Sequence, residues 1–310
     1  MPQKLSEYFV FLPEVAAALQ AHKPVVALET AVVTHGLPYP VNLQLAVQME
    51  QAVREQGCTP ATIGLLEGKV YVGLSQAQVE ALASQSGLRK ISRRDYAAAL
   101  AQHASGGTTV AGTMAAAHLA GIRVFATGGI GGVHREARFD VSADLPELGR
   151  TPMIVVCAGA KSILDLPATL EVLETSSVPV IGYQSNEFPA FYARSSGLKA
   201  PMRSDSPEEI SRIARAHWNL GNQSAVLVVN PPPSELAMAA EEMEAAVAQA
   251  IEEAHTAGIA GQAVTPYLLG RMNELTGGAS LQANLALLLN NARLAAQIAR
   301  ALQPGMGLSA

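Results

Sequence analysis

Short runs of apolar and β-branched residues alternate with segments of helical spacing between residues 25 and 230. Runs of this length predict buried strands, and the segments between them predict helices that cover a sheet on both faces. The predicted strands are VVAL (25–28), ATIGLL (61–66), VYVG (71–74), RVFA (123–126), MIVVC (153–157), VPVIGY (178–183) and AVLVVN (225–230). The predicted helices are 42–56, 76–85, 109–120, 162–174 and 207–219. The pattern therefore predicts an α/β protein.

The pattern changes at about Ser234, where long segments rich in Ala, Glu and Leu begin. They predict helices at 235–257, 264–276 and 278–302, which we expect to pack on the sheet. No internal repeat, charge block or Ser/Gly linker divides the chain. We therefore expect one domain over residues 1–310, with 304–310 as a flexible Pro/Gly tail.

Composition and charge narrow the class of protein. The chain has 310 residues, 49% of them hydrophobic, which supports a substantial core. Cys58 and Cys157 are too few for a disulfide framework or a cysteine metal site, which favours structural thiols in the cytoplasm. A net charge of −5 argues against a nucleic-acid partner but leaves room for a small anionic substrate.

No segment of the sequence predicts export or membrane insertion. Lys4, Glu7 and Pro13 interrupt any apolar run near the N-terminus that could form a signal peptide. The longest apolar stretch, 281–302, contains Asn284, Asn290, Asn291 and Arg293 at intervals too short for a membrane span. We expect that stretch to form a buried helix.

Polar residues that follow predicted strands are the best candidates for function, because ligands of open α/β sheets bind at the carboxyl ends of the strands. Glu29 follows VVAL, Gly128 opens a glycine-rich turn after RVFAT, and Lys161 follows MIVVCAGA. Asp140 and Asp144 lie in FDVSADL, between two of the strands. We expect a site at this edge of the sheet.

Lys161 is the strongest of these candidates. Small residues precede it, so its amine would lie partly desolvated at the sheet edge, where a neutral amine can attack a carbonyl carbon and form a Schiff base. The segment AGAKS is not a phosphate-binding P-loop, because Ala160 stands where that motif has glycine. An ordinary surface lysine at the start of a helix remains the alternative.

Glycine-rich and hydroxyl-rich segments could hold an anion. GGIGGVHR (128–135) places exposed backbone N–H groups next to His134 and Arg135, although a plain tight turn explains it equally well. In SGGTTVAGT (105–113), Thr108 and Thr109 precede an Ala-rich helix and could bind phosphate at its N-terminus. Ordinary helix capping is the simpler interpretation of the second segment.

The carboxylates allow more than one role. Asp140 and Asp144 offer hard oxygen ligands for Mg²⁺ or Mn²⁺, but loop aspartates are more often solvated or capping residues. Glu29 could be a general acid or base with a raised pKa. Glu29 could equally form an ion pair with a cation of KISRRD (90–95), namely Lys90, Arg93 or Arg94.

Taken in order, these segments resemble the pseudouridine-5′-phosphate glycosidase family over nearly the whole chain. The resemblance rests on VALETAVVTHGLPYP (26–40), KISRRD (90–95), TTVAGTM (108–114), FATGGIGGVHR (125–135), FDVSADL (139–145), CAGAKSILDLPAT (157–169) and LTGGASLQANLALLLNNA (275–292). It implies a three-layer α/β/α fold with a mixed, mostly parallel central sheet and a helical C-terminal part. It also implies a homotrimer.

The resemblance implies an activity, the reversible cleavage of the C–C glycosidic bond of pseudouridine 5′-phosphate to uracil and ribose 5-phosphate during pseudouridine catabolism. Lys161 would be the Schiff-base nucleophile, Glu29 the proton donor, and Asp140 the ligand of a divalent metal, most often Mn²⁺. The implied substrate contacts are Lys90, Val110, Ser142, Ala143, Asp144 and Asn284. We expect Thr108, Thr109, His134 or Arg135 to hold the 5′-phosphate.

Two other functions are open on the residues alone. A Schiff-base aldolase acting on a sugar phosphate would share the lysine and the phosphate site but would need no uracil pocket. A noncatalytic protein that binds a nucleotide or sugar phosphate would keep the glycine-rich loops and need no reactive lysine. Product identity separates the enzymes, and borohydride trapping of Lys161 separates both from the binder.

Overall fold

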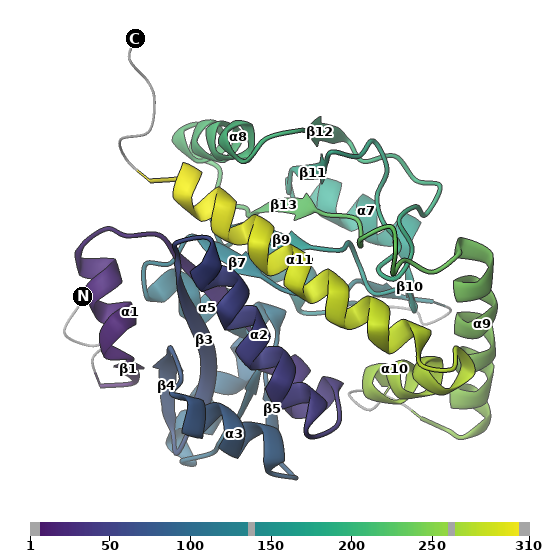
Figure 1. Cartoon of the computed structure of the whole chain (residues 1–310), viewed down its shortest axis with the longest axis horizontal. Coiled ribbons are helices and arrows are strands. Elements are labelled where there is room, and N and C mark those ends of the chain that lie inside the picture. Colours follow the sequence, from purple (N-terminus) through teal and green to yellow (C-terminus); the bar gives the residue numbers. More distant parts are fainter. Residues whose placement is uncertain (1–6, 136–139, 260–263, 304–310) are drawn as a thin grey trace.

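The computed structural model describes residues 7–135, 140–259 and 264–303. In these residues an 11-stranded sheet crosses the centre of the molecule (Figure 1). The strand order is β1-β4-β3-β2-β7-β9-β13-β11-β12, with β6 paired to β3 and β5 paired to β6. The strands of this sheet are β1 (Phe9–Phe11), β2 (Val25–Leu28), β3 (Thr59–Leu66), β4 (Lys69–Val72), β5 (Arg89–Ile91), β6 (Gly106–Thr108), β7 (Val124–Ala126), β9 (Ile154–Cys157), β11 (Val180–Tyr183), β12 (Met202–Ser204) and β13 (Val226–Val229).

The sheet is mixed but mostly parallel, as the sequence predicted. β3 runs antiparallel to β4 and to β6. The pairs that join β2 to β3 and β7, and β9 to β7 and β13, are parallel. A separate ribbon of β8 (Val133–His134) and β10 (Leu164–Asp165) pairs antiparallel. The parallel centre consists of the apolar runs that the sequence marked as strands.

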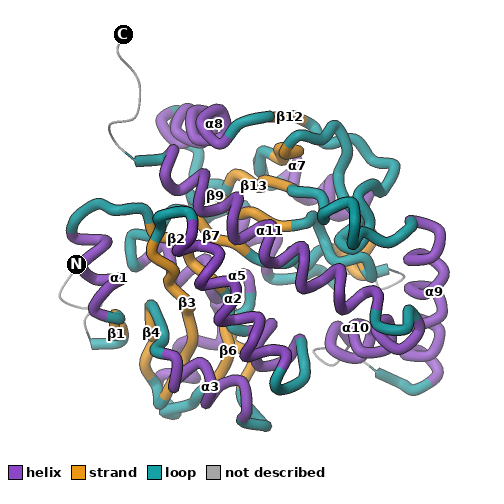
Figure 2. The backbone as a smooth tube through the Cα atoms, in the orientation of Figure 1, coloured by secondary structure: helices purple, strands orange, loops and turns teal. Residues whose placement is uncertain are grey.

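Helices cover the sheet on both faces. They are α1 (Pro13–Gln20), α2 (Val41–Glu55), α3 (Gln76–Ser84), α4 (Tyr96–Ala101), α5 (Val110–Leu119), α6 (Asp144–Leu148), α7 (Leu166–Thr175), α8 (Pro207–Asn219), α9 (Ala240–Thr256), α10 (Val264–Leu275) and α11 (Ala279–Ala301), with the π-helix η1 (Val32–Gly36) and the 3-10 helix η2 (Arg93–Asp95). Figure 2 shows α11 running diagonally across the sheet beside α2. On the other face, α5, α6 and α7 contact one another in turn. The layers are therefore α/β/α.

One buried apolar cluster runs from Val15 to Ala299 and includes the central strands and α11. The buried side of α11 is mostly apolar, and its Leu287, Ala295 and Ile298 are completely buried. No helix of the described residues is long and apolar enough to cross a membrane. The tail expected at 304–310 lies outside the described residues.

Some element boundaries differ from the sequence prediction. The helix expected from 162 begins at Leu166, because Asp165 caps it by accepting a hydrogen bond of 2.9 Å from the N–H of Ala168. Leu164 and Asp165 instead pair with β8. Lys161 therefore lies in a turn several residues before the helix, so the alternative of a lysine that starts the helix is wrong.

Candidate active site

Adjacent parallel strands end at one edge of the sheet, and candidate residues follow them there. Glu29 follows β2, Gly128 follows β7, and Lys161 follows β9 after a short turn. These residues line one cavity with about 540 Å³ of empty space, part of it open to solvent. Its other lining residues are Ala31, Val32, His35, Gly36, Lys90, Gly129, Phe191, Pro266, Leu269, Asn284 and Leu288. The structure thus brings the predicted acid and the predicted nucleophile together.

Glu29 is held by its neighbour strand. The hydroxyl of Thr127, which follows β7, donates a hydrogen bond to Oε1 of Glu29. Desolvation raises the pKa of the Glu29 carboxyl above its ordinary value, and the Asp144 carboxylate adds to the rise, while Lys161 and Lys90 oppose it. A carboxyl with a raised pKa retains its proton nearer neutral pH, as a general acid requires.

The backbone fixes the position of Lys161. Its N–H donates a hydrogen bond of 3.1 Å to the carbonyl of Ile130, which joins the lysine turn to the glycine-rich loop. Gly159 has a φ of +85°, and a Cβ there would lie 2.4 Å from the carbonyl oxygen of Pro189, so this turn requires glycine. Within the described residues, no hydrogen bond or ion pair engages the Lys161 amine. That amine is left to act on a ligand in the cavity.

Lys90 provides a second amine on the cavity wall. It belongs to β5, which the sequence did not predict because RKI carries little apolar signal. Burial lowers the pKa of Lys90, and the charge of Lys161 lowers it further, against the opposing effect of Asp144 and Glu29. The charges of Lys161, Asp144 and Glu29 all lie close enough to Lys90 to shift its pKa.

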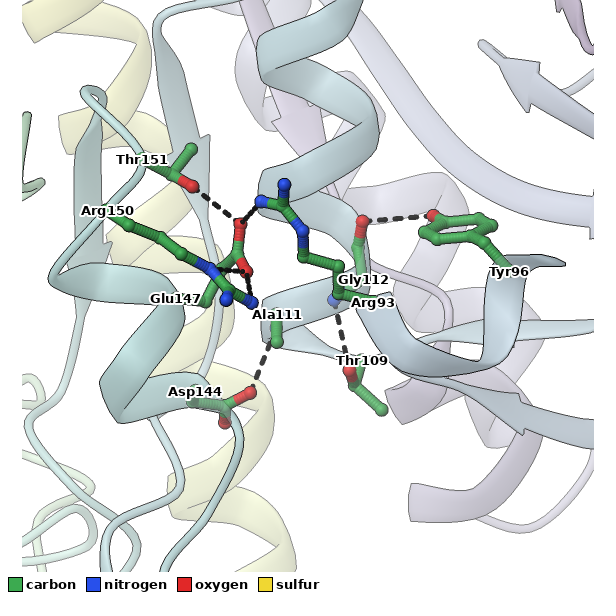
Figure 3. A network of polar contacts seen from close by, with 9 residues as sticks. All are labelled: Arg93, Tyr96, Thr109, Ala111, Gly112, Asp144, Glu147, Arg150 and Thr151. Atoms are coloured by element: carbon green, nitrogen blue, oxygen red, sulfur yellow. Dashed lines mark hydrogen bonds and ion pairs between the residues drawn. The ribbon is translucent and has the colours of Figure 1, made fainter.

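Asp144 is a fully engaged carboxylate rather than a solvated loop residue. Its Oδ1 accepts a hydrogen bond of 2.9 Å from the N–H of Ala111, in the first turn of α5 (Figure 3). Its Oδ2 accepts a hydrogen bond of 2.8 Å from the N–H of Gly131. A Cβ on Gly131 would lie 2.9 Å from Asp144 Oδ2 and 2.2 Å from Ser142 Oγ. The glycine-rich loop therefore makes room for this carboxylate.

The hydroxyl-rich segment before α5 is occupied by the fold. Thr109 caps α5, since its Oγ1 accepts a hydrogen bond of 3.2 Å from the N–H of Gly112. Thr108 is completely buried and donates to the carbonyl of Ile63. Val110, the first residue of α5, is also buried. These contacts correspond to the capping interpretation of this segment.

Comparison with known proteins shows the family. Residues 14–301 match the family model described as "Indigoidine synthase A like protein". The chain is 55% identical over 293 residues to the pseudouridine-5′-phosphate glycosidase of Solibacter usitatus, covering 94% of this chain and 98% of the relative. It is 50% identical over 300 residues to the one of Geobacillus kaustophilus, covering 96% of this chain and 100% of the relative. The chain belongs to the pseudouridine-5′-phosphate glycosidase family. It is an enzyme of this kind.

Solved structures agree with this assignment. A crystal structure of the prealnumycin C-glycosynthase AlnA in complex with ribulose 5-phosphate superposes with a TM-score of 0.88 at 42% identity, covering 96% of this chain and 97% of that one. An indigoidine synthase A-like protein from Thermotoga maritima superposes with a TM-score of 0.87 at 37% identity, covering 94% and 95% of the respective chains. These two proteins therefore share the three-layer fold of this chain, with its mostly parallel sheet.

The structure places His134 and Arg135 outside the lining of the central cavity. His134 pairs with Leu164 in the β8–β10 ribbon. The Arg135 guanidinium forms an ion pair with Glu244 of α9 and donates hydrogen bonds to the carbonyls of Leu164 and Ser162. Arg135 lines a different cavity, beside Ser162. The Arg135 guanidinium is therefore engaged by Glu244 and by two carbonyls, away from the lining of the cavity that contains Lys161.

The predicted metal ligand lies at the border of the described residues. Asp140 is exposed, and its carbonyl accepts a hydrogen bond of 2.9 Å from the N–H of His134. Among the described residues no group of at least three His, Cys, Asp or Glu side chains could hold a metal ion. A single exposed carboxylate fits a largely hydrated divalent cation rather than a caged one. Whether Asp140 binds a metal stays a prediction.

Asp140 is followed closely by the predicted substrate-binding residues Ser142, Ala143 and Asp144. The N–H of Ser142 donates to the carbonyl of Gly132, and its hydroxyl accepts a hydrogen bond of 3.2 Å from the N–H of Asp144. Ala143 is exposed. The segment therefore tethers the glycine-rich loop to α6 and carries Asp140 next to it.

The C-terminal helix completes the cavity of this glycosidase-family site. Asn284 of α11 is buried and lines the cavity. Further along the same helix, Asn291 donates hydrogen bonds of 2.9 and 3.4 Å to the carbonyls of Thr127 and Gly128. Sequence reasoning used Asn291 only to exclude a membrane span. A polar residue inside an apolar helix was the signal of this supporting role.

His35 is a lining residue that the sequence analysis missed. It lies in η1, and π-helical turns often occur at functional sites. Its Nδ1 is 2.6 Å from Thr34 Oγ1 and its Nε2 is 3.1 Å from the carbonyl of Leu88, just before Lys90. Burial lowers the pKa of His35. The only available signal was its place in the VTHG segment after Glu29.

The predicted ion-pair alternative for Glu29 is wrong in its arginine partners. Arg93 pairs with Glu147 at 2.6 Å, and Arg94 is 3.6 Å from its neighbour Asp95. Lys90 influences the pKa of Glu29 through its charge, within the same cavity. The cations of KISRRD are therefore divided between the cavity and a separate network.

Proposed function

We propose that this enzyme reversibly cleaves the carbon–carbon glycosidic bond of pseudouridine 5′-phosphate, giving uracil and ribose 5-phosphate, in pseudouridine catabolism. The observation that carries the proposal is the convergence of Lys161, Glu29 and Lys90 on one cavity of a chain in this family. The names of its relatives and the sugar phosphate bound by AlnA support the same class of substrate.

A lysine amine suits this bond because the sugar is attached to carbon C5 of uracil, which has no lone pair for a proton. Attack of Lys161 Nζ on C1′ breaks the C1′–O4′ bond, and O4′ takes a proton from Glu29. The ammonium formed by the attack then loses a proton, and the freed lone pair forms a C=N bond as the C1′–C5 bond breaks and C5 takes up that proton. Water hydrolyses the resulting imine, which releases ribose 5-phosphate and restores the amine.

The cavity provides groups for the other steps. Asp144 is close enough to influence the pKa of both Glu29 and Lys90, so we assign it to proton movement around C1′ and C5. Lys90 would bind an anionic or carbonyl oxygen of the substrate. Asn284, on the helix side of the cavity, would pair with the uracil ring through its amide.

The 5′-phosphate would anchor the sugar while it changes from ring to chain. Val110, Ser142 and Ala143 stay predictions as substrate contacts, and at the start of α5 the N–H groups of Ala111 and Gly112 are already bonded to Asp144 and Thr109. Thr108, Thr109, His134 and Arg135 stay predictions as phosphate ligands. Arg135 would first have to leave Glu244.

We assign the divalent metal, with Mn²⁺ as the expected ion, to Asp140. A bound cation there would supply positive charge and ordered water beside the substrate-binding loop. Asp140 is exposed and lies two residues before Ser142, so a cation there would sit on the solvent side of the loop. Homotrimeric assembly, a cytoplasmic location and the lack of a nucleic-acid partner also stay predictions.

The test is mass spectrometry of the protein incubated with Mn²⁺, uracil and ribose 5-phosphate, and separately with pseudouridine 5′-phosphate. Lys161→Ala and a metal-depleted sample are the controls, and Lys23→Ala is a matched control at an exposed lysine. We expect product with wild type and Lys23→Ala only. A folded wild type that neither makes nor cleaves pseudouridine 5′-phosphate would remove this function.

Borohydride added during turnover tests the Schiff base itself. Reduction of the imine should leave a ribose-phosphate adduct on the peptide that contains Lys161. An aldolase would also be trapped but would release a different product, whereas a noncatalytic binder would give no adduct. An active enzyme without any adduct would rule out the covalent step while leaving the overall reaction in place.

A further inference from the structure

Glu147 is a completely buried carboxylate outside the cavity lining (Figure 3). Its Oε1 accepts hydrogen bonds of 2.6 Å from Arg93 and 2.5 Å from Thr151. Its Oε2 accepts hydrogen bonds of 2.9 and 2.6 Å from the Nε and a terminal nitrogen of Arg150. Burying a charge is costly unless it is paired and hydrogen-bonded, and here both oxygens are engaged.

The same short helix holds Asp144 at its first position. Asp144 and Glu147 are three residues apart on α6, so they lie on one face of the helix. Asp144 binds the N–H groups of Ala111 in α5 and of Gly131 in the glycine-rich loop. The helix α6 is thus fixed at one end by its contact with α5 and at the other by Arg93.

The helix α5 is in turn joined to the segment that carries Arg93. The N–H of Thr109 donates a hydrogen bond of 2.9 Å to the carbonyl of Ile91, and the Tyr96 hydroxyl donates one of 2.9 Å to the carbonyl of Gly112. A Cβ on Gly112 would lie 2.4 Å from the Ile91 oxygen, so the two segments approach closely. Ile91 directly follows Lys90 on β5.

These contacts form a closed ring. It runs from Asp144 to the start of α5, from α5 to segment 91–96, from Arg93 to Glu147, and back along α6 to Asp144, as Figure 3 shows for its polar contacts. Lys90 lies immediately before segment 91–96, and Asp144 is part of the ring itself. In the Arg93–Glu147 contact both partners are side chains, whereas the Asp144 and Tyr96 contacts each have a backbone partner.

We propose that Arg93, acting through Glu147, is a positioning residue that fixes Asp144 relative to Lys90 for the reaction in the cavity. This inference rests on the proposed function. Arg93 lies 54 residues from Glu147 in the chain and joins separate elements. Arg150 binds the same carboxylate from only three residues away, within the α6 region, and joins nothing to the cavity.

Arg150 is therefore a matched control. It is 53% exposed and Arg93 is 48% exposed, and both are ion-paired with Glu147 at 2.6 Å. Arg150 makes more hydrogen bonds to Glu147 than Arg93 does. If the network served stability alone, replacing Arg150 would harm the enzyme at least as much as replacing Arg93.

The experiment measures kcat, KM and the midpoint of thermal unfolding for Arg93→Ala, Arg150→Ala and Arg93→Lys during cleavage of pseudouridine 5′-phosphate. We expect Arg93→Ala to lower kcat about 10- to 100-fold with little change in KM, because small displacements of catalytic groups cost that much. Arg150→Ala should retain kcat while its midpoint falls at least as far. Arg93→Lys keeps the charge and should restore part of kcat.

The outcomes distinguish failure of the positioning role of Arg93 from failure of the proposed function. An active wild type whose Arg93→Ala variant keeps kcat, or whose Arg150→Ala variant loses kcat equally, would overturn the positioning role alone. A wild type without activity would overturn the proposed function. If Arg93→Ala does not fold, Arg93→Lys decides the matter, since loss of kcat at an unchanged unfolding midpoint supports the role and unchanged kcat and KM contradict it.

Discussion

The side chain of Asn291 donates a hydrogen bond of 2.9 Å to the carbonyl of Thr127, which lies 164 residues earlier in the chain. Asn291 is completely buried, and its Oδ1 accepts a hydrogen bond from Asn230. The carbonyl of Thr127 comes just before the glycine-rich loop, and the Thr127 hydroxyl binds Glu29. A single amide therefore connects the last helix to the residue that holds the predicted acid.

Replacing this amide should destabilise the protein. Asn291→Leu leaves the Thr127 carbonyl without its donor in a buried setting, which should lower the free energy of unfolding by about 2 kcal/mol. Urea denaturation measures the change. Asn290→Leu is the control, because Asn290 is only partly buried and makes a longer bond of 3.3 Å to Pro231. Equal losses in both variants would contradict the role assigned to Asn291.

The raised pKa of Glu29 predicts the pH dependence of the reaction. Burial favours the protonated carboxyl, so the acid form persists above the ordinary value of 4.5 and is lost as the pH rises through the raised value. The rate should fall on that limb. Glu29→Gln keeps an acceptor for Thr127 but has no proton to give, so kcat should fall roughly 100- to 10,000-fold and lose this limb. The kcat–pH profiles of both proteins measure this.

The same shift has a consequence for stability. Because the folded state holds the Glu29 proton more tightly than the unfolded chain does, this group contributes stability below the ordinary pKa and loses it as the pH rises through the raised value. Glu29→Gln removes the cost of ionising the carboxyl. We therefore expect the variant to be more stable than wild type above that range, and a less stable variant there would contradict the assignment.

Replacing Lys90 should stabilise the protein but reduce its activity. Its lowered pKa means that burial and the nearby Lys161 penalise its charge in the folded state, so Lys90→Met should raise the unfolding midpoint by roughly 2 °C. The same change should lower kcat/KM about 10- to 100-fold, since a hydrogen bond to a charged group contributes about 1.5–3 kcal/mol. Calorimetry and steady-state kinetics measure the two effects. Exposed Lys23→Met should change neither.

The lowered pKa of Lys90 also predicts how the stability of the protein changes with pH. Between the lowered pKa and the ordinary value of 10.5, the unfolded chain binds more protons than the folded one, so the stability of wild type should rise with pH in that window. Lys90→Met should lack this rise. A wild type and a variant with parallel stability curves there would show that Lys90 is not desolvated.

The sequence predicted the centre of the fold because the central strands are apolar on both faces, as VVAL and MIVVC are. It missed β5 and β6, since RKI and GGT have no apolar run and depend on pairing with each other and with β3. It also missed α6, which has only five residues. Tertiary contacts, rather than local propensity, stabilise these elements.

Some residues of the candidate site could be predicted from the sequence and others could not. Glu29 and Lys161 could be predicted because each follows a recognisable strand, and the rule for strand ends then placed them together. The partners of Glu147 could not be predicted, because Arg93 is 54 residues away and contacts it through an element that the sequence did not reveal. His35 was hidden for a similar reason, since its link to Lys90 runs through the carbonyl of Leu88.

The glycine-rich loop gives the last prediction, with a matched glycine elsewhere. A Cβ on Gly131 would lie 2.2 Å from Ser142 Oγ and 2.9 Å from Asp144 Oδ2, so Gly131→Ala must displace the carboxylate from its N–H donors. We expect kcat to fall about tenfold or more. Gly270 lies inside α10, and beyond the backbone of that helix no atom of the described residues lies within 4 Å of an added Cβ. Gly270→Ala should keep kcat.

The control also has a positive expectation of its own. Alanine in place of glycine inside a helix should raise the free energy of unfolding by about 0.8–1.0 kcal/mol, so Gly270→Ala should be the more stable protein. Kinetics and urea denaturation of both variants give the comparison. If Gly131→Ala kept full kcat, the backbone around Asp144 would have to tolerate displacement, and the rigid placement of this carboxylate would be wrong.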